Sequence, residues 1–312
     1  MLGPASTVST AEPDGVEAIV HRQYAAAMTP SDAVERHPWN TEFTWVDHTG
    51  PFRRITQDQA EQFDRDGFIV LENVFTDDEL APVIAATDEV EARADAFLSG
   101  QDGGRFSIAE RGAITFGLFP VQTHQAARSF AAHPVFADVC HDLIGPDVRL
   151  YHDQAVYKQP EKPRRFPWHQ DNGYTFVTPQ QYLTCWVALT DATLDNGCPH
   201  VVRGLHRMGT LLHHYVDPLG WEIFEDHPDA VAAPVGKGGI VVFSSLSPHL
   251  TGPNTTDAVR KAYILQYAPD GAAALRGDPS TGPAGERTPA NDPHRQFPVL
   301  VGGEPVAVEP LG

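Results

Sequence analysis

The pattern of apolar and polar positions predicts a helix, a short strand and a second helix at the start of the organised part of the chain. Thr56, followed three positions later by a glutamine, has the spacing of a capping box, so the first helix is expected to begin there and to reach about Asp66. The apolar run 68–71 predicts a buried strand. A second helix is predicted from Thr76 to about Phe97, because its apolar positions recur at helical spacing.

From about residue 147 onward, short apolar runs alternate with turns rich in Gly, Pro, Asn and Asp, a spacing typical of an all-β sandwich or barrel. These runs predict strands at 148–158, 166–171, 182–190, 200–203, 239–244 and 260–268. Residues 205–236 are expected to form a less regular insertion. The predicted organisation is an N-terminal arm (1–55), one domain (56–270) and a C-terminal tail of loop (271–312).

Composition disfavours several classes of function. The chain has 22 basic and 41 acidic residues and a formal net charge of -19, so its surface repels nucleic-acid phosphates and anionic membranes. Neither a signal peptide nor an apolar run of about 20 residues is recognised. The three cysteines, odd in number and without CxxC spacing, predict a cytoplasmic protein without a disulfide framework. No pattern indicates an oligomeric state.

The pair His169 and Asp171 is the centre of the predicted site. Alternate side chains of a strand share a face, so this imidazole and this carboxylate are expected to point the same way. His249 follows a glycine turn and an apolar strand, and is expected to supply a third ligand. Two histidines and one carboxylate form the facial triad of non-haem iron(II) oxygenases, which leaves coordination positions open.

A 2-oxo acid can occupy two of those positions and dioxygen a third, and oxidative decarboxylation then yields an oxidant that attacks a C–H bond. A 2-oxo diacid needs a cation for its second carboxylate. Arg260, which begins the predicted strand 260–268, is the predicted anchor because a guanidinium clamps a carboxylate bidentately. Thr251 is expected to add a hydroxyl. The predicted cofactors are therefore Fe(II), 2-oxoglutarate and O2.

Other interpretations of the same residues stay open. Two imidazoles and one carboxylate also suit zinc, so a zinc-dependent hydrolase is an alternative, although it would have no use for Arg260. A non-catalytic binding protein of the same fold is another. A second HxD sequence, formed by His227 and Asp229, is rejected because its central proline blocks a regular strand.

As an ordered set, the motifs resemble the phytanoyl-CoA dioxygenase family of Fe(II)/2-oxoglutarate-dependent oxygenases over roughly residues 56–270. The set comprises Trp168–Asp171, Trp186–Thr193, Asn196–Cys198, Gly204–His206, His249 and Arg260. The resemblance implies a mainly β (α+β) domain with flanking helices and a double-stranded β-helix core, the cupin-like jelly roll. It also implies that His169, Asp171 and His249 are the catalytic iron ligands and that Arg260 anchors 2-oxoglutarate.

Family members that halogenate have a small residue in place of Asp171, so the resemblance implies an enzyme of the hydroxylase type. The expected reaction is hydroxylation of a small organic molecule, with release of succinate and CO2. Desaturation, epimerisation and ring formation share its first steps and stay open. A biosynthetic tailoring pathway is the favoured setting, and a catabolic one is the alternative.

Four further residues are assigned to the pocket. Trp186 and Gln154 are predicted to contact 2-oxoglutarate, with core packing or a structural role as the alternative for each. Tyr174 and Phe176 lie in the loop after the HxD motif and are predicted to form walls of the substrate pocket.

Two groups of polar residues are interpreted as structural. Four histidines share no strand or helix spacing and are not taken as a second metal site: His200, His206, His213 and His214. Lys162, Arg164 and Arg165 are interpreted as a solvated loop, and contact with an anionic substrate is the alternative.

Overall fold

The computed structural model of the protein describes residues 34–311, so the first 33 residues of the predicted arm lie outside the described residues. Its helices are α2 (Gln57–Asp66), α3 (Asp77–Ser99), α4 (Gln125–Ala131), α5 (Pro134–Leu143), α6 (Asp171–Tyr174) and the short 3-10 helices η1 (Asp102–Gly104), η2 (Pro120–Gln122) and η3 (Leu205–Met208). None of the helices in this described part is both long enough and apolar enough to cross a membrane.

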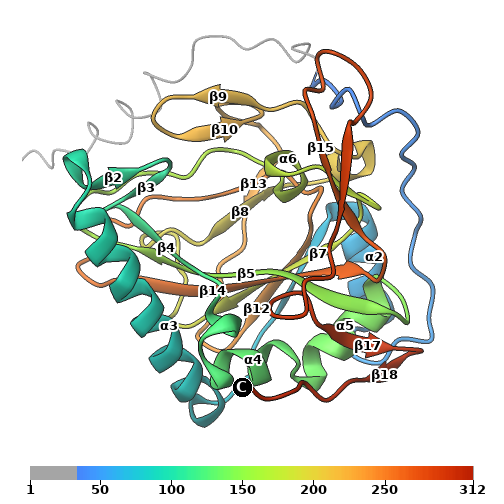
Figure 1. Ribbon diagram of the computed structural model, residues 1–312, viewed down its shortest axis with the longest axis horizontal. Coiled ribbons are helices and arrows are strands. Elements are labelled where there is room, and N and C mark those ends of the chain that lie inside the picture. The colour runs from blue at the N-terminus through green and yellow to red at the C-terminus, as the bar shows by residue number, and fades with distance from the viewer. Residues whose placement is uncertain (1–33, 312) are drawn as a thin grey trace, which may run out of the picture. The chain divides into compact units, whose positions relative to one another are not determined.

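One large antiparallel sheet organises the domain (Figure 1). Its strand order is β1 (Phe68–Leu71), β12 (Ile240–Ser244), β7 (Leu183–Ala188), β14 (Arg260–Pro269), β5 (Val148–Lys158), β4 (Ile114–Leu118), β3 (Ala109–Glu110) and β2 (Arg105–Phe106). Strand β17 (Pro298–Val301) also pairs with β5, and β18 (Glu304–Pro305) pairs with β17. A three-stranded sheet has the order β11 (Ala230–Ala232), β8 (Pro199–Val202) and β13 (His249–Thr251). A two-stranded sheet pairs β10 (Gly220–Glu222) with β9 (His214–Val216). Another three-stranded sheet has the order β16 (Glu286–Pro289), β15 (Ala273–Arg276) and β6 (Val177–Thr178).

The alternation of side chains along β14 separates two cores. Tyr263 and Leu265 belong to the core that packs against α2, α3, α4 and α5. Ala262 and Ile264 belong to a second core that joins the large sheet to Val201 of β8. Figure 1 shows α4 and α5 on one side of β5 and β14, and β8 and β13 on the other. Two facing antiparallel sheets flanked by helices confirm the predicted double-stranded β-helix.

Local signals placed the first elements correctly. In α2 the hydroxyl of Thr56 accepts from the N–H of Gln59, whose side chain accepts from the N–H of Thr56, which is the predicted capping box. Gly67 ends this helix with φ 84°, a left-handed conformation that favours glycine. A second capping box joins Thr76 to Glu79 at the start of α3.

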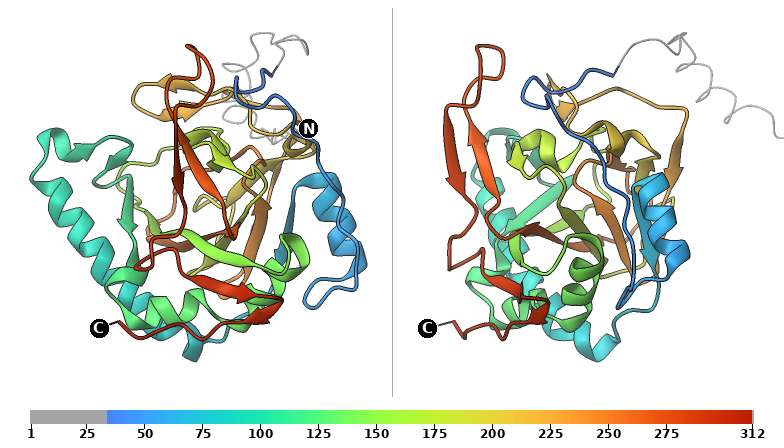
Figure 2. Two further views of the ribbon diagram at one scale, coloured as in Figure 1. Left: turned by 45° about the vertical axis from the view of Figure 1, so that its right-hand side comes forward. Right: turned by 90° about the vertical axis from the view of Figure 1, so that its right-hand side faces the viewer.

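Two predictions of secondary structure were wrong. Residues 166–171 do not form a strand, because only His169 makes a bridge and Asp171 already begins α6. The tail after residue 270 is more than loop, because it contains β15 to β18. Figure 2 shows this tail, in red, running along the domain.

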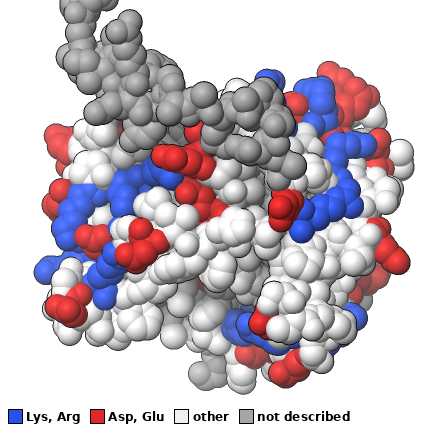
Figure 3. All heavy atoms as spheres, turned by 90° about the horizontal axis from the view of Figure 1, so that it is seen from above, with Lys and Arg blue, Asp and Glu red and all other residues white. Residues whose placement is uncertain are grey.

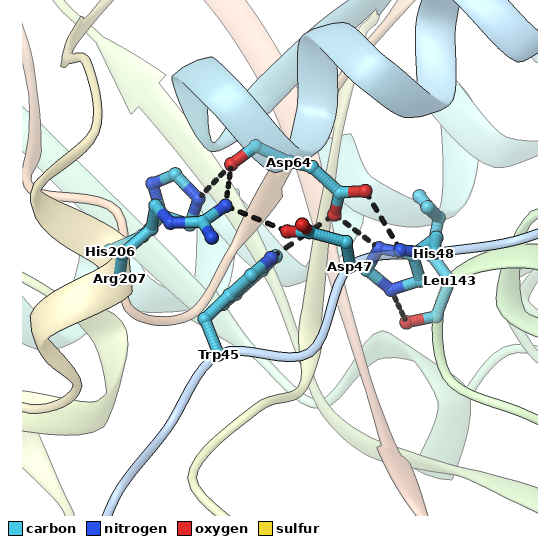
Figure 4. Close-up of polar contacts among 7 residues, drawn as sticks. All are labelled: Trp45, Asp47, His48, Asp64, Leu143, His206 and Arg207. Atoms are coloured by element: carbon cyan, nitrogen blue, oxygen red, sulfur yellow. Dashed lines mark hydrogen bonds and ion pairs between the residues drawn. The ribbon is translucent and has the colours of Figure 1, made fainter.

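The segment before α2 is held by a buried acidic side chain (Figure 4). The carboxylate of Asp64 accepts from the indole N–H of Trp45 at 3.1 Å and from the backbone N–H of His48 at 2.7 Å. The ring of His48 places Nδ1 2.6 Å from Asp64 Oδ1 and Nε2 3.0 Å from the carbonyl oxygen of Leu143. Both ring nitrogens of His48 thus have an oxygen partner within hydrogen-bond distance, which holds the ring in place. The carbonyl oxygen of Asp64 also accepts from Nε2 of His206 at 3.1 Å.

Asp64→Ala is expected to lower the free energy of unfolding by about 2–4 kcal/mol, because the ring of His48, its backbone N–H and the buried indole N–H of Trp45 lose their common partner. Urea unfolding followed by circular dichroism measures this difference. Glu61→Ala, on an exposed position of the same helix, is the matched control and should change stability by less than about 0.5 kcal/mol. Equal effects of the two substitutions would contradict the bracing role of Asp64.

Candidate metal centre

His169 and His249 lie side by side because their backbones pair as an antiparallel bridge. The N–H of His169 donates to the carbonyl oxygen of His249 at 3.0 Å, and the reverse bond is 2.8 Å long. Nδ1 of His169 lies 2.9 Å from the carbonyl oxygen of Pro167, and Nδ1 of His249 lies 3.0 Å from that of Ser247. Donation from Nδ1 leaves Nε2 of each ring free to bind a metal ion.

Asp171 offers a third candidate ligand atom. Its Oδ1 lies 3.8 Å from Nε2 of His169 and 3.8 Å from Nε2 of His249. The hydroxyl of Thr184 in β7 donates to Oδ2, which leaves Oδ1 for the ion. The three ligand atoms lie within 4.8 Å of one another, so a single ion can bind all three with small side-chain movements. Burial, together with the neighbouring His249, lowers the pKa of His169 well below its ordinary value, which favours the neutral ring that metal binding needs.

The residue between the two ligands fixes the turn that brings Asp171 into place. The N–H of Gln170 donates to Nε2 of His213 at 2.9 Å, so the backbone leaves strand geometry immediately after His169. The buried Gln170 side chain accepts from the N–H of Leu211 at 2.7 Å. Gly173 is required by close approach, because a Cβ there would lie 2.0 Å from the ring of His213. The ligand pair therefore converges through a strand-to-helix turn, where the sequence had predicted a continuous strand.

Arg260 is a fully buried cation with unused hydrogen-bond donors. Its Cζ lies 5.0 Å from the centre of the Trp186 ring, and Nη1 makes one long bond of 3.4 Å to the carbonyl oxygen of Val156. Nε and Nη2 have no acceptor among the described residues. Burial lowers the pKa of Arg260 to about 9. A carboxylate is the partner that such a guanidinium fits.

Lys158 stands opposite Arg260 in the sheet, yet it is not available for a ligand. Its Nζ donates to the carbonyl oxygens of Arg164 and Thr251, each at 2.9 Å, and to that of Gly252. These three acceptors use all three donors of an ammonium group. Arg260 is thus the cation of this pair that keeps donors for a carboxylate.

A cavity of about 540 Å³ lies next to the three ligands and includes them in its lining. Three residues predicted to contact 2-oxoglutarate, Gln154, Trp186 and Thr251, line this cavity, as does Tyr174, a predicted substrate contact. Arg260 itself does not reach the cavity surface and lies against Trp186, which does.

Phe176 does not line the cavity. Its ring lies 4.8 Å from that of His37 and 5.7 Å from that of Trp39, measured between ring centres. Phe176 therefore packs the loop against the segment that precedes α2, and we assign it no contact with substrate.

Sequence reasoning missed several residues that shape the site. Thr184 alternates with Trp186 on β7, so the inward assignment of Trp186 already implied an inward Thr184. Gln266 shares a face with Arg260 and also lines the cavity. No local signal marks His213, because its bond to Gln170 joins positions 43 apart.

The remaining histidines stay structural. Within the described part of the chain, His169, Asp171 and His249 are the one group of three metal-ligand side chains. His206 and His213 are buried and bond to backbone groups, and burial lowers the pKa of each to about 4. His214 is exposed on β9.

Two imidazoles and one carboxylate inside a double-stranded β-helix, with a buried guanidinium nearby, define the class of non-haem iron oxygenases that use a 2-oxo acid. The sequence model of the family called phytanoyl-CoA dioxygenase matches residues 63–262, which is most of the domain. The chain therefore belongs to the phytanoyl-CoA dioxygenase family of Fe(II)/2-oxoglutarate-dependent oxygenases.

Curated relatives agree with this assignment. A phytanoyl-CoA dioxygenase domain-containing protein 1 homolog from Dictyostelium discoideum is 24% identical over 257 residues, which cover 69% of this chain and 91% of that protein. A methylphosphonate hydroxylase from Gimesia maris is 30% identical over 167 residues, which cover 48% of this chain and 59% of that protein.

Solved structures share the fold. SnoK, a carbocyclase from nogalamycin biosynthesis that depends on α-ketoglutarate, has a TM-score of 0.58 at 23% identity and covers 72% of this chain and 89% of its own. EvdO2 from Micromonospora carbonacea has a TM-score of 0.57 at 26% identity and covers 73% of this chain and 96% of its own. EvdO2 has also been solved in complex with 2-oxoglutarate.

Proposed function

We propose that the protein is an Fe(II)- and 2-oxoglutarate-dependent dioxygenase of the hydroxylase type that oxidises a small organic molecule and releases succinate and CO2. The observation that carries this proposal is the combination of the three ligands with a buried guanidinium whose Nε and Nη2 lack acceptors among the described residues. The cavity of about 540 Å³ lies within the range of small-molecule sites. A biosynthetic tailoring role and a cytoplasmic location are parts of the same proposal.

The residues divide the work of the site. The metal ion supplies, when bound, the redox chemistry that couples decarboxylation of 2-oxoglutarate to oxidation of the substrate. His169, Asp171 and His249 hold it, and Thr184 orients the carboxylate of Asp171. Arg260 receives the second carboxylate of the cosubstrate, with Thr251, Gln154 and Trp186 as the nearby walls.

Metal exchange tests the proposal against the zinc hydrolase alternative. Metal-free protein is loaded with either Fe(II) or Zn(II) under nitrogen and supplied with 2-oxoglutarate, and succinate is measured after air is admitted. The iron-loaded protein is expected to form succinate even without its substrate, in a slow reaction that consumes O2. The zinc-loaded protein should form none, because zinc has no redox chemistry.

Free Fe(II) at the same concentration is the control for this measurement. Succinate formation no faster than with free Fe(II) would refute the proposal and favour a non-catalytic protein of the same fold. Succinate formation that did not require O2 would refute it equally.

A further inference from the structure

The inward face of the large sheet has a charged end and an uncharged end. Arg260 stands opposite Lys158 at one end of the β14–β5 pair. Three rows further along the inward face, Gln266 stands opposite His152 and, on its other side, opposite Thr184. Burial lowers the pKa of His152, so this ring is neutral. A molecule at the end away from Arg260 therefore meets uncharged polar groups on this face of the sheet.

An apolar wall of the cavity adjoins β5 in the same sheet. It is built from the end of α3, the β2–β3 hairpin and β4, and its members are Phe97, Leu98, Phe106, Ile108, Phe116 and Leu118. Phe97 and Phe106 contact each other with ring centres 5.4 Å apart and are 52% and 59% exposed, so they stand at the mouth. Among the described residues that line the cavity there is no Lys or Arg.

Basic side chains near the mouth are already paired. Lys162 and Arg164 donate to the carboxylate of Glu110 in β3 at 2.9 Å and 2.8 Å. Arg165 pairs with Glu222 of β10. These bonds tie the loop after β5 to the β2–β3 and β9–β10 hairpins, and they leave no free cation among the three for an anionic ligand. Figure 3 shows, on the described part of one face of the molecule, that basic side chains have acidic ones beside them.

The cations at the other end of the cavity are also outside it. Arg295 bonds to Asp292 at 3.2 Å and stacks on the ring of Phe119 at 4.8 Å. Arg276 is exposed and does not line the cavity. The formal net charge of -19 adds a general repulsion of anions.

An uncharged amide in the cavity lining is available to select a ligand. Gln266 is only 7% exposed, lines the cavity, and makes no side-chain hydrogen bond to any other described residue. An amide offers one acceptor and two donors without charge, so it pairs with a hydroxyl or a carbonyl group. A carboxylate or phosphate placed there would be buried with no Lys or Arg in the cavity lining to pair with it, which is costly.

We propose that the molecule oxidised at this site is uncharged and largely apolar, with its body against the Phe97–Phe106 wall and a hydroxyl or carbonyl group at Gln266. This rests on the proposed function, since it names the substrate class of the same site. It predicts that acyl-CoA esters, phosphonates and carboxylates are poor ligands, although the family and the methylphosphonate hydroxylase carry the names of such substrates.

Matched probes of equal shape and different charge test this. Iron-loaded full-length protein with 2-oxoglutarate is kept under nitrogen, and binding is measured by equilibrium dialysis. The probes are anthracenemethanol against anthracenecarboxylate, and decanol against decanoate. In each pair we expect the Kd of the alcohol to be lower than that of the carboxylate by a factor of about ten or more. Equal or tighter binding of the carboxylates, or no binding of either alcohol, would overturn the proposal.

Substitutions in the cavity and outside it distinguish an effect of charge in the cavity from a general loss of structure. Leu118→Lys places a cation in the apolar wall and should shift the preference toward the carboxylates by about tenfold or more. Leu194→Lys, at a position that is 63% exposed and outside the cavity lining, is the matched control and should change nothing. Gln266→Leu should weaken binding of the alcohols roughly fivefold and leave unsubstituted anthracene unaffected.

Binding needs no turnover, so its outcome is independent of succinate formation. If succinate forms from 2-oxoglutarate but the carboxylates bind as well as the alcohols, the substrate class is wrong and the proposed function stands. If the alcohols are preferred but no succinate forms, the cavity selects uncharged ligands and the proposed function is wrong. An unchanged preference in Leu118→Lys would show that charge in the cavity does not govern selection and would overturn the proposal.

Discussion

Asp171→Ala is expected to abolish iron binding at micromolar metal and to reduce succinate formation to the level of free Fe(II). Loss of partners outside the coordination shell already weakens metal sites by about 10–100-fold, so loss of the sole anionic ligand should exceed about 100-fold. Two neutral imidazoles remain, and they cannot balance the charge of a divalent ion. Metal content after dialysis and succinate formation measure the two effects.

The second HxD sequence provides a matched control for this substitution. Asp229 follows His227 at the same spacing but is exposed, and Asp229→Ala should retain both iron and activity. Circular dichroism should show that both variants are folded. Iron bound in normal amount by Asp171→Ala would remove Asp171 from the metal centre.

Arg260→Ala is expected to raise the concentration of 2-oxoglutarate needed for half-maximal succinate formation by about 100-fold or more, because loss of a buried charged partner costs about 3 kcal/mol or more. The maximal rate at saturating 2-oxoglutarate should fall less, since the iron ligands are untouched. The measurement is succinate formation as a function of 2-oxoglutarate concentration.

Lys261→Ala controls for changes at the same strand. Lys261 is the next residue of β14, points to the other face and pairs with Asp88 at 2.7 Å, so its loss should leave the 2-oxoglutarate dependence unchanged. Arg260→Lys keeps the charge without the planar fork and should give an intermediate requirement. An unaltered requirement in Arg260→Ala would exclude Arg260 as the anchor.

Elements with strong local signals were predictable from the sequence. The capping boxes at Thr56 and Thr76 fix helix starts within a few residues, and a long alternating run gave β5 (Val148–Lys158) its observed bounds. The tail was misread because its strands have two to four residues, too short for periodicity to be visible. Its pairing partner β5 lies about half the chain away, and no local pattern records such a contact.

The candidate site likewise contains residues that the sequence predicts and residues that it does not. Its candidate ligands could be named because few residue types bind iron, and Arg260 because a guanidinium on an apolar strand needs an anion. The residues that position these side chains could not be predicted. Gln170 and His213 meet only when the chain folds, and the place of Phe176 depends on the segment around Trp39. His169 and Asp171 were expected to converge because they alternate on one strand, whereas a strand-to-helix turn brings them together.

The hydroxyl of Thr184 has a consequence for the number of bonds the protein makes to its ion. It engages one oxygen of Asp171, so the carboxylate would offer an ion its other oxygen alone, and each of the three residues would contribute a single donor atom. A chelating carboxylate would take up one more vertex of an octahedron. By restricting Asp171 to one bond, Thr184 would keep a further position of a bound ion available for exchangeable ligands.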